Sequence, residues 1–294
     1  MLGQFVNTQP SLDGRPFLCH RKPEWLALED KTVIDAFFDR AEVPRADSDV
    51  VAADQELLRD ASKRLDRGRG VVWSGDAKEG FNGGAEYVFW VHDNESFAVA
   101  ADFLSSRCDR VRVAPFLEGI PCSIHGLVLP DGVATLRPVE MMTLRRTDAN
   151  ALPGSSLFTY RGCASFYEPG QKLRAAMATA ASRVGRLLRS EVDFRGCFTL
   201  DGVVTAQGFL PTEVNPRQGA GLFVMLKGLD SIPVSLLMDA LGGGVDLGLS
   251  ASRIEADLTP IADEHPAGGT WATVGAPVPE LGTAVGPLSA AVSG

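Results

Sequence analysis

The chain has 294 residues, of which 45% are hydrophobic and 22% charged, a composition typical of a soluble globular protein with one or two domains. Its net charge of −9, without a long basic run, argues against nucleic acid or an anionic membrane as the main partner. No uncharged apolar stretch approaches the ~20 residues of a membrane helix, and no secretory signal is recognisable near the N-terminus.

The predicted elements follow an irregular lead-in, residues 1–25, which lacks any periodicity. In chain order they are a helix over 30–41, a helix over 54–66, strands over 70–73 and 87–91, and a helix beginning at Asp93 or Asn94. The glycine-rich segment 74–84 separates the two strands, so this region is predicted to be a hairpin with a long tip.

The second half of the chain is predicted to contain mainly antiparallel strands and one long helix. In chain order the elements are strands over 110–116, 122–129 and 133–141, a loop over 147–170, a helix over 171–192, strands over 196–200 and 209–215, a helix over 231–241, and an extended chain from about 257. A helix-flanked hairpin unit followed by a larger unit of strands and helix is an α+β fold.

The cysteines and histidines do not form a metal-binding pattern. The five cysteines and four histidines are scattered, without a CxxC or HExxH grouping. An odd number of isolated cysteines fits buried thiols in a reducing compartment better than a disulfide framework or a zinc site. We therefore expect a cytoplasmic protein that is not a zinc enzyme.

Polar residues alternate along the predicted strand "FLPTEVN" and just beyond it. Glu213, Asn215 and Arg217 are spaced two apart, so their side chains would face the same side of a strand. Asp201 lies on the preceding predicted strand, which would run antiparallel beside it. Two acids and an amide suit Mg²⁺, and an arginine suits a phosphate. The pattern also fits a solvent-exposed strand face, and Asp201-Gly202 fits a turn.

Four stretches in sequence order resemble the ATP-grasp ligases. "TEVNPRQGAG" (212–221) is similar to the E-x-N-P-R strand of that family, and "FRGCFTLDG" (194–202) to the segment that precedes it. "LEDKTVIDAFFDRAEVPRAD" (28–47) resembles the segment that opens the nucleotide-binding unit. "VRVAPFLEGIPCSIHGLVLPDG" (111–132) is similar to the hinge strand and the strand after it. The resemblance covers roughly residues 26–245.

The resemblance implies ATP and Mg²⁺ as cofactors. It places Mg²⁺ on Asp201, Glu213 and Asn215, and the phosphates of ATP on Lys31 and Arg217. The remaining residues that it implies are the hinge residues that hold adenine and ribose, the loop that covers the phosphates, and a cation for the acceptor substrate. They are Pro115, Phe116, Leu117 and Glu118 for the hinge, Lys78, Gly80, Gly83 and Gly84 for the loop, and Arg161 for the acceptor.

The chain departs from the family at the strand before the glycine-rich loop. The family usually has a lysine at the end of that strand, where it contacts the α-phosphate, whereas "GVVW" ends in Trp73. Lys78 in the loop could replace the missing cation, although an exposed loop lysine is also commonly just solvated. Glu118 likewise stands near, but not at, the family's usual ribose-binding acid.

The resemblance also implies a division of the chain. Residues 26–112 would form a small subdomain with the glycine-rich loop, and residues 113–250 a large subdomain with the Mg²⁺-binding strands. They would lie between the lead-in, 1–25, and an extended C-terminal segment, 251–294. Family members normally carry a further α/β domain before this point, so we expect most of that domain to be missing. A homodimer or a completing partner chain would supply the rest.

The function that the resemblance implies is an ATP-dependent carboxylate–amine ligase acting through an acyl phosphate, with small-molecule acid and amine substrates. Two alternatives stay open on the sequence. One is an ATP-binding protein of ATP-grasp ancestry that no longer catalyses, which Trp73 and the missing domain favour. The other is a different α+β fold in which residues 211–221 form only a sheet edge.

Overall fold

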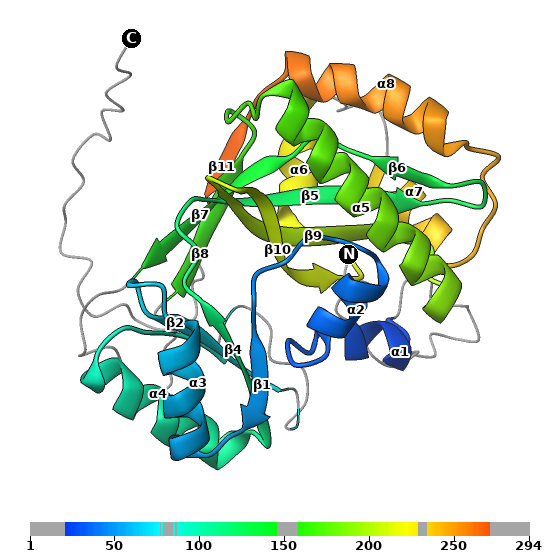
Figure 1. The fold of residues 1–294 in the computed structure, drawn as a ribbon. Helices are drawn as coiled ribbons and strands as arrows, with labels where there is room; N and C mark the ends of the chain where they lie inside the picture. The colour runs from blue at the N-terminus through cyan, green and yellow to red at the C-terminus, as the bar shows by residue number, and fades with distance from the viewer. Residues whose placement is uncertain are drawn as a thin grey trace, which may run out of the picture.

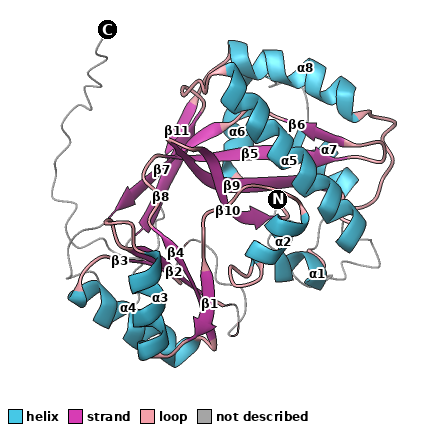
Figure 2. Cartoon of the chain, in the orientation of Figure 1, coloured by secondary structure: helices cyan, strands magenta, loops and turns pink. Residues whose placement is uncertain are grey.

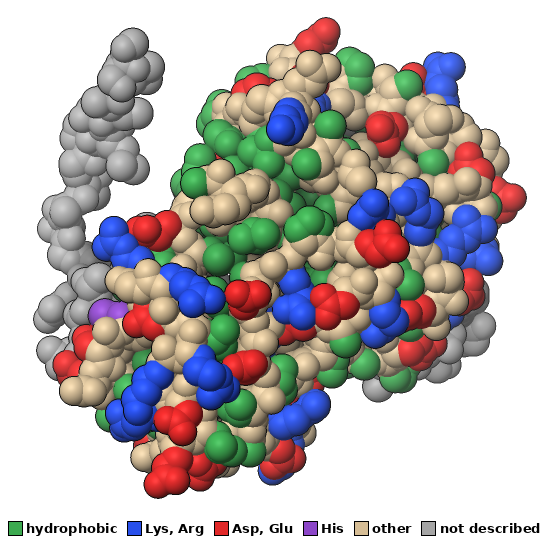
Figure 3. Space-filling model, in the orientation of Figure 1, with side chains coloured by type: hydrophobic (Ala, Val, Ile, Leu, Met, Phe, Trp, Pro, Cys, Tyr) green, Lys and Arg blue, Asp and Glu red, His purple; other side chains and the backbone are tan. Residues whose placement is uncertain are grey.

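The computed structural model of the chain describes residues 21–76, 78, 85, 87–145, 158–228 and 234–270. These residues form two antiparallel sheets with helices packed against them (Figure 1). On the face drawn in Figure 3, acidic and basic side chains are interspersed. None of the helices in the described part of the chain is both long and apolar enough to span a bilayer.

The smaller sheet has four strands in the order β1-β4-β2-β3, and two helices cover one of its faces (Figure 2). Its elements are β1 (Asp49–Ala52), α3 (Gln55–Leu65), β2 (Val71–Gly75), β3 (Val88–Val91), α4 (Asn94–Arg107) and β4 (Arg110–Pro115). Both helices begin where the sequence predicts, because Asp54 and Asp93 accept hydrogen bonds from backbone N–H groups of the first turns.

The larger sheet has seven strands in the order β10-β9-β5-β7-β8-β11, with β6 paired to β5. Its strands are β5 (Ile120–Val128), β6 (Val133–Thr135), β7 (Val139–Arg145), β8 (Phe158–Ala164), β9 (Gly196–Thr205), β10 (Gly208–Asn215) and β11 (Gly268–Thr270). The helices that accompany it are α1 (Pro23–Leu26), α2 (Ile34–Arg40), α5 (Gln171–Val192), α6 (Ala220–Met225), α7 (Val234–Gly242) and α8 (Ala251–Glu264).

The two faces of the larger sheet are distinguished by strict alternation along β5 and β9. Cys122 and Ile124 of β5 pack with Phe198 and Leu200 of β9 in a core shared with α5, α1 and α2. The intervening residues, among them Ser123 of β5, point to the opposite face. On that face α6 and α7 cover one end through Leu127 and Cys197, and the other end is open to a cavity.

Helix α2 begins later than the sequence predicts, and this delay positions Lys31. The Asp30 side chain accepts hydrogen bonds from the Thr32 backbone N–H at 2.8 Å and its hydroxyl at 2.7 Å, so a turn precedes the helix. Phe37 and Phe38 then anchor α2 in the core of the larger sheet. Residues 23–25 of the predicted irregular lead-in belong to the short helix α1, and Trp25 is buried in the same core.

The predicted loop over 147–170 is wrong over residues 158–164, which form strand β8. Arg161 and Gly162 interrupt any alternation of apolar residues there, so the strand is defined by its pairing with β7 and β11 rather than by its pattern. Residues 146–157 lie outside the described part of the chain.

The predicted extended chain from about 257 is wrong over residues 257–264, which continue helix α8 through Pro260. Tertiary contacts stabilise this helix where local propensity is weak. Asp263 pairs with the buried Arg137 at 2.5 Å and with Arg174 at 2.8 Å, and Glu255 accepts a hydrogen bond from the Thr135 backbone N–H at 2.8 Å. Helix α7, predicted over 231–241, is observed over Val234–Gly242.

Candidate functional site

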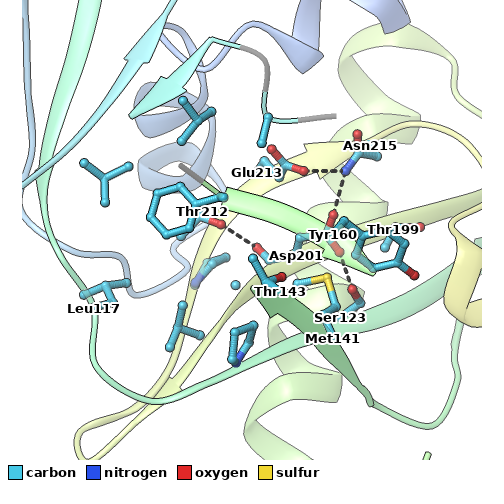
Figure 4. A pocket seen from close by; sticks show the side chains of 18 of the residues that line it. Leu117, Ser123, Met141, Thr143, Tyr160, Thr199, Asp201, Thr212, Glu213 and Asn215 are labelled. Atoms are coloured by element: carbon cyan, nitrogen blue, oxygen red, sulfur yellow. Dashed lines mark hydrogen bonds between the residues drawn. The ribbon is translucent and has the colours of Figure 1, made fainter. Parts of the chain in front are cut away.

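A cavity of about 580 Å³ lies between the two sheets and is lined by residues of both. One end is apolar and includes Val72, Ala114, Leu117 and Phe158. The other end is polar and is formed by side chains of β5, β9 and β10, seen from close by in Figure 4. This cavity contains most of the residues that the sequence predicts for a nucleotide site.

The acidic pair Asp201 and Glu213 stands at the centre of the polar end. The two residues are direct partners across β9 and β10, at the point where a bulge follows Pro211. The Asn215 amide nitrogen donates to Asp201 Oδ2 at 2.8 Å and to Glu213 Oε1 at 3.1 Å, so both carboxylates contact one nitrogen (Figure 4). The Ser123 hydroxyl donates to the other oxygen of Asp201.

Both cations predicted for the site reach the same end of the cavity. Lys31 Nζ lies 2.9 Å from Glu213 Oε2. Arg217 Nη2 donates to Asn215 Oδ1 at 2.9 Å, just beyond the end of β10. The structure therefore brings together all five residues, although Lys31 is 170 positions before Asp201 in the chain.

Glu29 also belongs to this charge network, and the sequence analysis missed it. Its carboxylate, 7% exposed, lies 2.6 Å from Arg21 Nη1 and 3.4 Å from Arg217 Nε. A buried carboxylate between two guanidinium groups helps to fix the position of Arg217. Nothing in the local spacing signals this contact, because Glu29 reaches Arg217 only through the packing of residues 27–29 against β10.

The two acids of the pair have opposite pKa shifts. Burial, together with the negative charge of Glu213, raises the pKa of Asp201 above its usual value. Burial also acts to raise the pKa of Glu213, but the Lys31 ammonium and the hydrogen bonds from Lys31 and Asn215 outweigh it and lower that pKa. The pair therefore tends to share one proton, held on Asp201, while Glu213 stays ionised beside Lys31.

The donor set of this pair fits a divalent cation. Two adjacent carboxylates and a neighbouring amide are hard ligands of the kind Mg²⁺ prefers, with water and phosphate completing the shell. Within the described residues no cluster of three or more His, Cys, Asp or Glu side chains is placed to hold a metal, so such an ion would rely on these two acids. The Asn215 amide nitrogen faces the acids, so the amide must rotate before its oxygen can serve as a ligand.

The four predicted hinge residues, Pro115, Phe116, Leu117 and Glu118, all line the cavity. Pro115 has no N–H, and the Phe116 N–H donates to Gly70 O at 3.0 Å. Among the three residues predicted to hold adenine, Leu117 is therefore the one whose N–H can donate to a base. Glu118 is exposed and pairs with Arg69 at 3.0 Å.

Trp73 does not stand in the cavity at all. Its side chain is fully buried on the helix-covered face of the small sheet, where its indole N–H donates to Ser62 Oγ at 2.9 Å and its ring contacts Phe97. The cavity-facing residues of β2 are Val72 and Ser74. This strand thus contributes no cation to the cavity, and Trp73 does not fill the place of the lysine found in the family.

The other predicted residues lie away from the cavity or outside the described part of the chain. Lys78 pairs with Asp109 at 2.5 Å, and neither its side chain nor Arg161 of β8 is among the residues that line the cavity. Gly80, Gly83 and Gly84 lie outside the described residues. The roles predicted for these five residues stay predictions.

Two buried side chains of the polar end were not selected from the sequence, His125 and Thr199. They are direct partners across β5 and β9, and Thr199 is also the partner of Asn215. Neither has a recognisable motif, although Thr199 follows from extending the alternation of Asp201 along its strand by two residues. The four cysteines of the described part are buried and form no disulfide, and burial raises the pKa of Cys122 and Cys197 to about 12. These thiols pack in the interior rather than act as nucleophiles.

Sequence comparison finds no protein-family model and no curated protein that matches the chain. Structure comparison does find matches. N5-carboxyaminoimidazole synthase of Aspergillus clavatus, in complex with ADP and 5-aminoimidazole ribonucleotide, matches with a TM-score of 0.59 and 9% identity, over 78% of this chain and 54% of that chain.

Two further matches come from other enzymes. Phosphoribosylamine–glycine ligase of Thermotoga maritima matches with a TM-score of 0.55 and 17% identity, over 75% of this chain and 56% of that one. The biotin carboxylase domain of the Hydrogenobacter thermophilus 2-oxoglutarate carboxylase, in complex with MgADP, ADP and bicarbonate, matches with a TM-score of 0.56 and 16% identity, over 76% of this chain and 47% of that one. This chain spans about half the length of these structures, and likeness at such identities concerns the fold.

Proposed function

The chain has the ATP-grasp fold, and on this basis we propose that it is an ATP-dependent ligase that joins a small-molecule carboxylate to an amine through an acyl phosphate. The observation that carries the proposal is the acidic pair Asp201 and Glu213, held with Asn215, Lys31 and Arg217 at one end of a cavity. An acidic pair flanked by cations is the equipment that phosphoryl transfer needs.

The apolar end of the cavity supports an assignment to the adenine base. The rings of Phe116 and Phe158 are almost parallel, at 8°, with centroids 6.5 Å apart, and both line this end. A purine can stack on such a face, while the Leu117 N–H donates to a ring nitrogen. ATP bound there would extend its phosphates toward Asp201 and Glu213.

Mg²⁺ would be held by Asp201, Glu213 and, after its amide rotates, Asn215, and when bound it would neutralise phosphate charge. Lys31 would exchange its Glu213 partner for a phosphate oxygen. Arg217, fixed between Asn215 and Glu29, would present its guanidinium to the phosphoryl group being transferred.

The proposed reaction has two balanced steps. An oxygen of the substrate carboxylate attacks the γ-phosphorus of ATP, the bond to the β-phosphate oxygen breaks, and acyl phosphate and ADP result. The amine lone pair then attacks the acyl carbon and forms the C–N bond. The C–O bond to phosphate breaks, inorganic phosphate leaves with the electron pair, and the nitrogen loses one proton. The protein must exclude water in between, because water would hydrolyse the acyl phosphate.

We further propose that the chain acts in the cytoplasm, which the four buried cysteines of the described residues support, since none of them forms a disulfide. A second copy or another chain would contribute to its acceptor side. The glycine-rich loop with Gly80, Gly83 and Gly84 would cover the phosphates, and Arg161 would hold the acceptor carboxylate.

The proposal is tested by measuring Mg²⁺-dependent ATP binding calorimetrically, and ADP release with a panel of amino acids. Asp201→Asn and Glu213→Gln are each expected to weaken Mg²⁺-dependent ATP binding at least about tenfold and to abolish ADP release. Hydroxylamine should trap the acyl phosphate as a hydroxamate. Asp257→Asn, the same change in an exposed ion pair of α8, is the matched control. ATP binding that both cavity variants leave unchanged, without ADP release, would refute the ligase.

A nucleotide-binding protein without catalysis is the second candidate. The observation that favours it is the small-sheet wall, where the cavity-facing residues of β2 are Val72 and Ser74 rather than a lysine. This candidate predicts ATP binding that depends on Asp201 and Glu213, with no ADP release for any combination of acid and amine. The same two measurements therefore separate the candidates.

A further inference from the structure

His125 lies at a boundary on the inner face of the larger sheet. Moving along β5 and β9, the pair Leu127 and Cys197 is covered by α6 and α7, and the pair Ser123 and Asp201 opens into the cavity. His125 and its partner Thr199 stand between these two pairs. Both residues line the inner end of the cavity.

Neither ring nitrogen of His125 has a hydrogen-bond partner among the described residues, although the side chain is completely buried. A buried polar atom without a partner destabilises the folded state, so native proteins rarely keep one without a reason. Leu127, two residues along the same strand face, is the apolar side chain that packs under α6 and α7, so that part of the core does not need the imidazole. The imidazole is therefore explained better by something it binds than by packing.

Two glycines bring the chain after β10 directly against this imidazole. A Cβ added at Gly219 would lie 2.8 Å from His125 Nε2 and 2.4 Å from Thr199 Oγ1. A Cβ added at Gly221 would lie 2.6 Å from His125 Cε1. Gly219 and Gly221 also line the cavity, so at its inner end the ring edge meets backbone rather than another side chain.

The charge state of the ring restricts what it can bind. Burial lowers the pKa of His125 to about 3, so the ring is neutral at pH 7, with one N–H donor and one acceptor nitrogen. A neutral ring gives no ionic attraction to a carboxylate or a phosphate. Its acceptor nitrogen, by contrast, suits the N–H of an amine.

We propose that the inner end of the cavity is the subsite for the amine substrate, with His125 accepting a hydrogen bond from the amine N–H. The assignment rests on the proposed ligase function and extends it to the nucleophile. The register places His125 two strands from Asn215, about 10 Å away between backbones, which is within reach of an acyl phosphate held at Arg217. The imidazole would orient the nitrogen lone pair toward the acyl carbon.

The test uses the full chain labelled with ¹⁵N-histidine, whose ring nitrogens report their hydrogen bonds by NMR. His125→Gln identifies the His125 signals by their loss, and His92 and His265, which do not line the cavity, are internal controls. Ammonium, methylamine, hydroxylamine and single amino acids are added in turn to the protein with Mg²⁺ and a non-hydrolysable ATP analogue. An upfield shift of the unprotonated His125 nitrogen with at least one amine, and none with acetate, is expected.

A second variant separates binding from folding. His125→Leu has similar volume and no unpaired nitrogens, so its melting temperature should equal or exceed that of the wild type. Its affinity for the amine that shifts the His125 signal should fall about tenfold, whereas ATP affinity should stay within about twofold. A purely structural histidine predicts the reverse, with lower stability and unchanged amine affinity.

The outcomes distinguish this subsite from the ligase proposal. If the ATP analogue binds and no amine moves the His125 signals, or acetate moves them equally, the amine subsite is refuted and the nucleotide site stands. If the ATP analogue does not bind at all, the proposed ligase function itself is refuted, and the amine subsite that rests on it is refuted with it. Unchanged amine affinity in His125→Leu would also overturn the subsite.

Discussion

The two walls of the cavity differ in how they are built. The wall formed by β9 and β10 presents Asp201, Glu213 and Asn215, with Lys31 and Arg217 beside them. The facing wall of the small sheet presents Val72 and Ser74 of β2 and Arg112 of β4, whose guanidinium is paired with Asp35 at 2.7 Å, while Trp73 is buried on the other face. The acidic pair and two of the lining cations therefore stand on one wall, whereas the cation of the other wall, Arg112, is already paired with Asp35.

This difference shows how little a motif position says about the direction of a side chain. The sequence predicts Trp73 at the position where the family usually has a lysine, yet strand alternation turns the Trp73 side chain toward α3 and α4. A cation reaches the cavity instead from the turn before α2, which carries Lys31 to the large-sheet wall. Substitutions on each wall test this unequal division of roles, from the largest expected effect to the smallest.

Trp73→Ala should lower the free energy of unfolding by about 3–5 kcal/mol, because it empties a fully buried site under two helices. Urea unfolding measures this change. ATP affinity, measured under conditions where the variant stays folded, should match the wild type. A large loss of ATP affinity without loss of stability would instead place Trp73 in the nucleotide site and contradict the division of roles between the two walls.

Arg217→Met should reduce ADP release about 10²–10³-fold, because it removes the guanidinium that faces the transferring phosphoryl group. Steady-state assays of ADP release at saturating ATP give this number. Arg253→Met, which removes an exposed guanidinium of α8, is the matched control and should leave the rate unchanged. Equal rates of ADP release for the two variants would show that Arg217 does not take part in phosphoryl transfer.

The buried His125 predicts a dependence of stability on pH. Its pKa is about 3 in the folded protein and about 6.5 when unfolded, so between these values the unfolded state binds more protons. Stability should therefore rise with pH through this window, and at pH 5 this residue alone should cost about 2 kcal/mol relative to pH 7. His125→Leu should remove that part of the pH dependence in urea unfolding. An unchanged profile would mean that the ring is already paired.

Lys31→Met should have opposite effects on two ligands of the charged wall. ATP affinity should fall about tenfold, because a phosphate partner is lost, while affinity for Mn²⁺ alone should rise, because Glu213 loses its competing ammonium. Calorimetry with ATP and electron paramagnetic resonance with Mn²⁺ measure the two effects. Lys63→Met on the exposed face of α3 is the control. A fall in both affinities would show that Lys31 does not compete with the metal.

Glu118→Gln, at the apolar end, should weaken ATP binding by no more than about two- to fivefold. Its carboxylate is exposed and paired with the exposed Arg69, so a contact with ribose would be largely screened by water. Calorimetric titration of ATP measures the effect. A loss of ATP affinity above about tenfold would show that Glu118 contributes strongly to nucleotide binding, which would contradict the assignment of most of that binding to the large-sheet wall.

Much of the fold is predictable because its signals are local. Helices α3, α4 and α5 have capping residues or continuous apolar stripes, and the strands β9 and β10 carry a period-two alternation. Strand β8 and the second half of helix α8 escape prediction for the opposite reason, since Gly162 and Pro260 oppose the observed structure locally. Pairing with β7 and β11, and the contacts of Asp263 with Arg137 and Arg174, override that preference.

By itself the sequence determined which side chains share a strand face, because alternation is a property of the backbone of each strand. The spacing of Glu213, Asn215 and Arg217 is therefore enough to group them. Only the tertiary structure decided which distant residues join them, since Glu29, Lys31 and His125 reach the cavity through the packing of α2 and the order of strands in the sheet. Such contacts depend on how layers meet in space, and no spacing along the chain encodes that.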